Sequence, residues 1–197
     1  MSAFTTVAAA RTQALVRRAR HRDLEAIARV ERLSAVLYAP YGLAERLALA
    51  VTPESTVLRA LEAGLAWVAE EPGGEVVGMA LASDAGADLH LDEIDVIPSR
   101  LRRGIGTLLL DAVLAEARAR GAARLTLLTV DFVPWTLGFY ARHGFRVLSR
   151  GELDARLEAE LGIRGDEPAA QRSFDGRIVA FKALEPGART DPSSKAR

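Results

Sequence analysis

The chain has 197 residues, of which 49% are hydrophobic, enough for one well-buried domain rather than two. Lysine plus arginine equals aspartate plus glutamate at 26 each, so overall charge does not favour nucleic acid, and without cysteine there is no disulfide framework or thiolate nucleophile. No stretch has the length of a membrane span or signal peptide, and the three histidines, His21, His90 and His143, lack metal-ligand spacing. We therefore expect a cytoplasmic protein without metal, nucleic-acid or membrane partners.

The sequence predicts a central folded region between two tails. Small and polar residues predict flexible tails at 1–12 and 186–197, around a single domain at 13–185. Periodicity and turn residues predict, in chain order, a strand at 14–19, a helix at 23–32, helical stretches at 44–49 and 56–63, strands at 65–70, 76–83 and 88–97, a helix at 107–120, a strand at 124–130, a helix from Pro134, a strand at 145–148, a segment at 152–176 that is helical early and loop-like later, and a strand at 178–184. Pro72-Gly73-Gly74 predicts a hairpin turn. Because strands and helices do not alternate strictly, the order indicates an α/β sandwich of the α+β kind around a mixed sheet.

The most informative segment joins the strand at 88–97 to the next helix. It reads Val-Ile-Pro-Ser-Arg-Leu-Arg-Arg-Gly-Ile-Gly from Val96 to Gly106. Gly104 and Gly106 lack Cβ, so backbone N–H groups at the helix start can turn toward a phosphate, which the helix dipole also favours. Arg102 and Arg103 add positive charge there. The segment predicts an anion-binding loop, and the chain has neither a Walker motif nor the third glycine of a dinucleotide fingerprint.

This segment resembles the coenzyme A pyrophosphate loop of the GNAT N-acetyltransferase superfamily, a Val-x-Pro strand end followed by Gln/Arg-x-x-Gly-x-Gly/Ala and a helix. Arg103, Gly104, Ile105 and Gly106 match, whereas Leu101 stands where the family has glutamine or arginine. The resemblance implies a mostly antiparallel sheet of about seven strands, flanked by helices and splayed where acetyl-CoA binds. It also implies a cofactor-binding set made of a pyrophosphate loop and a strand backbone that holds the pantetheine arm: Arg102, Arg103, Gly104, Ile105, Gly106 and Thr107 for the loop, and Ile94, Asp95 and Val96 for the strand.

A second segment, Phe132–Phe145, resembles the part of the same family in which a helix ends in an aromatic residue and a tyrosine, followed by x-x-x-Gly-Phe. By that match Tyr140 lies near the coenzyme sulfur, and Gly144 ends the helix in the left-handed conformation. Many members carry asparagine at the position of Val133. Thr136 is then a candidate to supply the polar contact to pantetheine instead.

Acetyl transfer needs a base for the amine proton and an acid for the leaving thiolate. Tyr140 is the candidate acid, because a phenol with a pKa of about 10 can hydrogen-bond a developing thiolate without itself ionising at neutral pH. Glu93 is the candidate base, acting through water, because it matches a glutamate that some family members carry on this strand; burial is expected to raise its pKa. The acidic group Asp92, Glu93 and Asp95 can also be a solvated strand face, or can attract a cationic amine.

The motifs together predict direct acetyl transfer from acetyl-CoA to a primary amine, here taken to belong to a small molecule. Two alternatives stay open: a non-catalytic sensor that binds acyl-CoA, and an enzyme that acetylates a protein or peptide. The acceptor pocket is expected from 33–49 and 152–176, which carry no readable substrate code, and a homodimer stays open as well.

Overall fold

In the computed structural model, the described residues are 13–42, 51–160 and 177–184. The expected helical stretch at 44–49, both expected tails and the later part of 152–176 lie outside these residues. The single domain expected at 13–185 stays a prediction.

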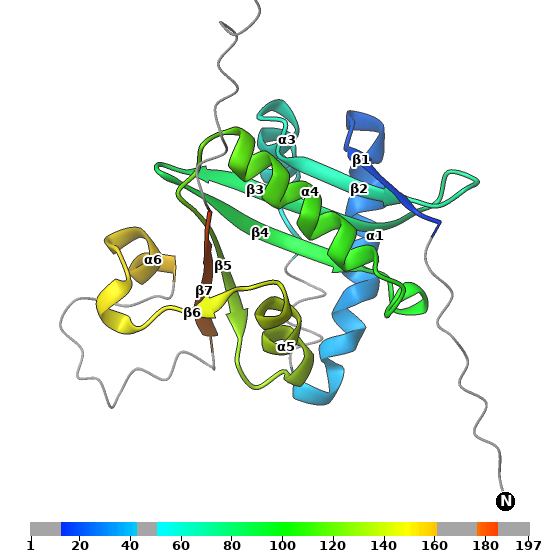
Figure 1. The fold of residues 1–197 in the computed structure, drawn as a ribbon. Coiled ribbons are helices and arrows are strands. Elements are labelled where there is room, and N and C mark those ends of the chain that lie inside the picture. The colour runs from blue at the N-terminus through cyan, green and yellow to red at the C-terminus, as the bar shows by residue number, and fades with distance from the viewer. Residues whose placement is uncertain (1–12, 43–50, 161–176, 185–197) are drawn as a thin grey trace, which may run out of the picture. The chain divides into compact units, whose positions relative to one another are not determined.

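Seven strands form a sheet in the order β1-β2-β3-β4-β5-β7-β6 (Figure 1). Their bounds are Leu15–Arg18 (β1), Ala66–Glu70 (β2), Val76–Ala85 (β3), Asp88–Val96 (β4), Arg124–Val130 (β5), Arg146–Val147 (β6) and Arg177–Ala183 (β7). The pairs β1–β2, β2–β3, β5–β7 and β6–β7 are antiparallel, and β4–β5 is parallel. The strand β7, which comes last among the described strands, thus pairs on both of its edges, with β5 and with β6. The predicted fold class, a mixed and mostly antiparallel sheet with helices, is confirmed.

The helices fall close to their predicted positions. The α-helices are Leu24–Ser34 (α1), Glu54–Glu62 (α3), Ile105–Ala119 (α4), Pro134–Arg142 (α5) and Ala155–Glu160 (α6), and the short 3-10 helices are His21–Asp23 (η1), Ala35–Tyr41 (η2), Pro98–Arg100 (η3) and Arg150–Glu152 (η4). Two helix starts differ by two residues from the prediction: α3 begins at Glu54, not at residue 56, and α4 begins at Ile105, not at Thr107. Ile105 is 1% exposed, and burial of its side chain fixes the first turn of the helix earlier than the glycines suggested.

The described residues divide into two compact units, and the first lies within Met1–Leu81 and Glu93–Val113. In this unit Gly73 and Gly74 have φ of +108° and +87°, which makes the predicted hairpin between β2 and β3. The first turns of α4 lie over β3 (Figure 1). The approach is close: a Cβ on Gly78 would come within 3.1 Å of the Leu109 side chain and 3.2 Å of the Ile105 side chain. Gly78 therefore lets the start of α4 approach the strand closely.

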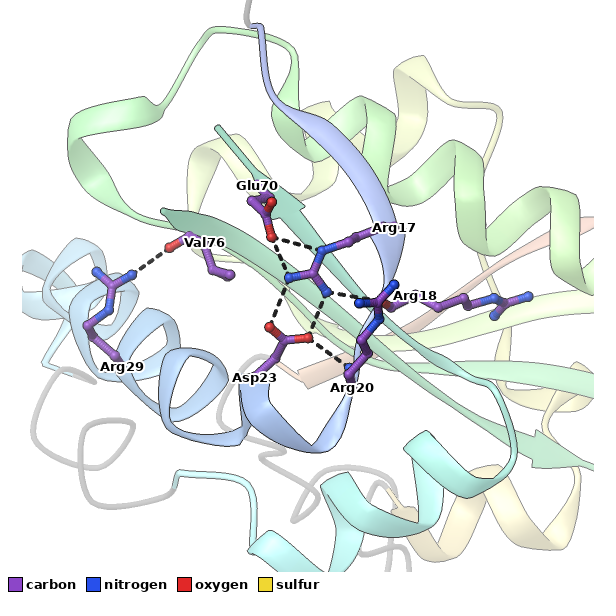
Figure 2. Close-up of polar contacts among 7 residues, drawn as sticks. All are labelled: Arg17, Arg18, Arg20, Asp23, Arg29, Glu70 and Val76. Atoms are coloured by element: carbon purple, nitrogen blue, oxygen red, sulfur yellow. Dashed lines mark hydrogen bonds and ion pairs between the residues drawn. The ribbon is translucent and has the colours of Figure 1, made fainter. Parts of the chain in front are cut away.

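An ion-pair network in the same unit connects β1, β2 and the residues before α1 (Figure 2). Arg17 donates from Nη1 and Nη2 to the Asp23 carboxylate at 2.7 and 2.9 Å, and from Nε to Glu70 Oε2 at 2.9 Å. Asp23 is buried and also accepts the backbone N–H of Arg20 at 2.8 Å. The hydrogen bonds from Arg17 hold the pKa of Asp23 below its ordinary value. The network therefore fixes the chain where it turns from β1 into α1.

The second unit lies within Ala82–Asp92 and Leu114–Arg197. In it, β5 pairs with β7 along its whole length and with the Leu89–Leu91 segment of β4. One buried cluster packs beside these strands, with Leu128 and Leu153 against it: Leu148, Leu157, Val179 and Phe181. The short strand β6 and the helix α6 are thereby attached to the β5–β7 pair.

Candidate functional site

The loop between β4 and α4 has an unusual backbone. After Pro98 starts η3, residues 101–104 are all exposed. Arg102 has φ of +62°, a left-handed conformation that residues with a Cβ rarely adopt, and Gly104 has φ of +87°. Such conformations are costly and persist where surrounding contacts hold them, often at binding sites.

Contacts on the strand side hold this loop in place. The Ile97 N–H donates to Val77 O at 3.0 Å, which keeps the end of β4 on β3. Arg100 Nε donates to Glu71 Oε1 at 2.8 Å, and this arginine lowers the pKa of Glu71. The Glu71 carboxylate thus fixes Arg100, and so it fixes the backbone immediately before Arg102 and Arg103.

The start of α4 has the features of an anion-binding site. The N–H groups of a helix's first turn have no partner within the helix, and the dipole is positive there. Gly104 immediately precedes this turn, and a Cβ placed on it would meet nothing within 4 Å. Arg102 and Arg103 are exposed beside it. Open space, free N–H groups and two guanidinium groups fit a phosphate or pyrophosphate.

The predicted strand residues lie in the same unit, at the end of β4. Ile94 and Val96 are half-buried and alternate with Glu93 and Asp95, so the two acidic side chains share one face of the strand. The paired part of β4 and β5 comprises Leu89–Leu91 with Leu125–Leu127, although β4 continues to Val96. Glu93 is exposed, so the expectation that it is buried was wrong. The Glu93 side chain therefore lies at the solvent-facing edge of the acidic group.

Asp95, rather than Glu93, is the carboxyl group in a low-dielectric environment. Desolvation by burial raises its pKa to about 6, opposed by a hydrogen bond from Ser34 and assisted by the charge of Glu31. Ser34 and Glu31 lie on α1 and are buried. Tyr38 in η2 belongs to the same group, because burial and the charges of Asp95 and Glu93 raise its pKa to about 12.

Sequence reasoning missed the part of this acidic group that lies on α1. Glu31 falls on the apolar face of the helix, four residues after the buried Ile27, and that placement of an acidic residue was the available signal. Ser34 and Tyr38 fall in the region 33–49 that was expected to build the acceptor pocket. The part of that region within 43–50 lies outside the described residues.

Tyr140 lies on α5 in the second unit, where it is half-buried. Its ring packs edge-on against Phe139, with centroids 5.2 Å apart, and against Phe145 at 5.6 Å. Gly144 has φ of +81°, as predicted for the residue that ends this helix. The contacts with these two aromatic rings fix the position of the Tyr140 ring.

Thr136 does not take the role suggested for it. Its Oγ1 lies 2.8 Å from both Val130 O and Val133 O, and the residue is 7% exposed. The single hydroxyl proton is therefore engaged by the backbone at the start of α5. Thr136 fixes the entry of this helix rather than offering a donor to pantetheine.

The histidines have structural contacts. His90 is buried with Nδ1 2.8 Å from Thr126 Oγ1, and His143 donates from Nδ1 to Phe139 O at 2.8 Å. Within residues 13–42, 51–160 and 177–184, no group of histidine and acidic side chains could hold a metal ion. In the same ranges no helix is long and apolar enough to cross a membrane.

Three solved structures resemble this fold closely. A PaiA N-acetyltransferase from Thermoplasma acidophilum in complex with coenzyme A has 16% identity and a TM-score of 0.66, with 87% of this chain and 99% of that chain covered. N-acetylglutamate synthase from Neisseria gonorrhoeae, complexed with coenzyme A and N-acetyl-glutamate, has 21% identity and a TM-score of 0.63, covering 87% of this chain and 35% of that one. The ribosomal-protein-S18-alanine N-acetyltransferase from Escherichia coli has 16% identity and a TM-score of 0.60, covering 90% and 98%.

The sequence also matches a family model. Residues 37–145 match the model of the acetyltransferase (GNAT) family, and this range contains both the β4–α4 loop and the tyrosine segment. The match covers more than half of the chain. The protein therefore belongs to the GNAT acetyltransferase family and is an acetyltransferase.

Proposed function

We propose that this enzyme transfers the acetyl group of acetyl-CoA directly to the primary amine of a small molecule. The observation that carries the proposal is the β4–α4 loop, where a left-handed Arg102, an open Gly104 and the first turn of α4 meet. These features match what a pyrophosphate needs. The coenzyme A in the related structures supports the same cosubstrate.

In this proposal the cosubstrate is held at two places. The guanidinium groups of Arg102 and Arg103 and the N–H groups of Ile105, Gly106 and Thr107 bind the pyrophosphate, with Gly104 leaving room for it. The backbone of Ile94, Asp95 and Val96 binds the amides of the pantetheine arm as a neighbouring strand would.

The chemical step needs no covalent enzyme intermediate, and without cysteine the chain has no thiol to form one. Glu93 acts as base through a water molecule and takes the amine proton. The amine nitrogen then attacks the thioester carbonyl carbon, a C–N bond forms, and the C–S bond breaks. Tyr140 donates its hydroxyl proton to the departing thiolate.

The related structures differ in the acceptors that their names give. One of them has N-acetyl-glutamate bound, and another is named for an alanine of a ribosomal protein. For this chain the acidic pair of the buried Glu31 and the half-buried Asp95, with Ser34 and Tyr38 beside it, favours a small amine over a peptide. A largely desolvated carboxylate pair suits one compact cation better than an extended backbone.

A thiol-release assay with acetyl-CoA tests the proposal. We expect turnover with small primary amines and little with peptides that present a free N-terminus. Turnover with peptides alone would contradict the small-molecule acceptor. Tight acetyl-CoA binding without turnover on either panel would favour the sensor alternative.

A further inference from the structure

Glu31 has an unused carboxylate oxygen inside the first unit. The residue is 8% exposed, and its Oε1 accepts the Thr52 hydroxyl at 2.5 Å and the Thr52 N–H at 3.2 Å. Its Oε2 is buried and accepts no hydrogen bond from any residue the structure describes. An ionised oxygen in that position is costly unless a cation or donor reaches it.

Asp95 adds a second carboxylate to the same place. The Ser34 hydroxyl, which lowers the pKa of Asp95, donates to Glu31 O at 2.9 Å. One hydroxyl carries one proton, so it cannot donate to both acceptors at once. Among the described residues no arginine, lysine or histidine forms an ion pair with Glu31 or Asp95.

Counted over the residues that the structure describes, the group is therefore rich in acceptors and has no positive charge. The hydroxyl of Tyr38 and the exposed carboxylate of Glu93 border it, and neither supplies that charge. An alkylammonium group carries one positive charge and three N–H donors, which match the unused acceptors of two carboxylates. A carboxylate next to the amine, as in an α-amino acid, would meet like charge here.

We infer that Glu31 and Asp95 form the binding subsite for the ammonium group of the acceptor, so that the substrate class is an alkylamine without a carboxylate beside the amine. This inference rests on the proposed function for its meaning in catalysis. The side chains of Glu31 and Asp95 select the acceptor, whereas acetyl-CoA binding is assigned to the β4–α4 loop and to the backbone at the end of β4.

Three probes of similar size test the subsite on the whole protein: butylamine, norvaline, which adds an α-carboxylate to butylamine, and butan-1-ol, which has a hydroxyl in place of the amine. Thermal unfolding is followed at neutral pH and constant ionic strength for the wild type, Glu31→Gln, Asp95→Asn and the control Glu25→Gln, which changes an exposed residue of α1. We expect butylamine alone to raise the Tm of the wild type and of the control. In Glu31→Gln the half-saturating butylamine concentration should rise by about tenfold or more, as for a lost charged hydrogen bond.

Glu31→Gln keeps the shape of the side chain and its acceptor for Thr52, so it should fold and should gain Tm without ligand. The inference is overturned if butan-1-ol stabilises as well as butylamine, if no probe stabilises the wild type, or if Glu31→Gln responds to butylamine like Glu25→Gln. If a variant fails to fold, the comparison of the three probes on the wild type still tests whether the subsite binds an ammonium group.

Calorimetric titration with acetyl-CoA separates this inference from the proposed function. Its Kd should be the same in Glu31→Gln, Glu25→Gln and the wild type. Absence of acetyl-CoA binding in the wild type would overturn the proposed function, while the butylamine response would still decide the ammonium subsite.

Discussion

Tyr140 can be tested apart from its ring packing, because its ring packs against Phe139 and Phe145 and the change to phenylalanine keeps that ring. Tyr140→Phe should lower kcat by about 10-fold or more while leaving the acetyl-CoA Kd unchanged, since a proton donor to the thiolate acts mainly in the transition state. Steady-state kinetics and calorimetry measure the two quantities. An unchanged kcat, with chemistry shown to limit the rate, would remove Tyr140 as the acid.

Asp95 gives the protein a pH dependence of known sign. Its pKa is about 6 in the folded protein and 3.8 in its ordinary state, so between these values the folded state binds more protons than the unfolded state. Stability from this group therefore falls as pH rises from about 4 to about 6, by at most about 3 kcal/mol. The charged group that acts on it is Glu31 in α1, and the charges of Asp95 and Glu93 in turn raise the pKa of Tyr38.

Urea unfolding of the wild type and Asp95→Asn at pH 4 to 7 isolates this contribution. Asp95→Asn should gain stability relative to the wild type across that interval and keep the gain above it. A difference that does not change with pH would show that Asp95 titrates in its ordinary range.

At the scale of elements, the approach of α4 to β3 depends on Gly78. A Cβ there would lie 3.0 Å from Asp95 O, as well as close to Leu109 and Ile105. Gly78→Ala should cost about 1 to 3 kcal/mol in unfolding free energy and weaken acetyl-CoA binding, because the start of α4 must move. Gly151→Ala is the control, since nothing lies within 4 Å of its added Cβ. Equal stability of the two variants would show that α4 tolerates the shift.

The ion pair between Arg17 and Asp23 fixes the connection between β1 and α1 (Figure 2). Asp23→Asn should cost about 3 kcal/mol at pH 7, because it removes one of the two charged partners of the half-buried Arg17 guanidinium, the other being Glu70. The pKa of Asp23 is lowered in the folded protein, so the wild-type advantage is present above about pH 4 and is lost as pH falls through the folded-state value. Chemical unfolding across pH, with the exposed Asp111→Asn as control, measures this; a cost that persists unchanged at low pH would contradict it.

The elements were largely predictable because local rules place them. Proline opens α5, and the Gly73-Gly74 pair makes the hairpin, each through backbone conformation alone. The start of α4 was misplaced because it depends on burial of Ile105 against β3, a contact between distant parts of the sequence. The position of β7 between β5 and β6 likewise follows from pairing that no local pattern records.

The same distinction applies to the candidate site. The glycines and arginines of the β4–α4 loop are close together in the sequence and form a local motif, so the anion-binding loop could be predicted from the sequence. The difference between the exposed Glu93 and the desolvated Asp95 depends on α1 and η2 packing beside β4. That environment brings Glu31 and Ser34 to Asp95 from far along the chain, and no spacing in the sequence encodes it.

At the scale of the whole molecule, equal numbers of acidic and basic residues conceal a local separation of charge. Exposed arginines lie at the β4–α4 loop, and the acidic side chains of Glu31 in α1 and Asp95 in β4 influence each other elsewhere in the same unit. One place suits an anion and the other a cation, as expected for an enzyme that binds a phosphate-bearing cosubstrate and an amine.

Acetyl-CoA binding to Gly104→Glu, measured by titration calorimetry, tests the central claim most directly. The substitution puts a negative side chain where the pyrophosphate is proposed to bind. Gly86→Glu is the matched control, since Gly86 also has a positive φ, at +73°, and open space around it, but lies in the turn between β3 and β4. We predict that Gly104→Glu weakens binding by about 100-fold or more, while Gly86→Glu binds like the wild type. Wild-type affinity in a folded Gly104→Glu would contradict the account.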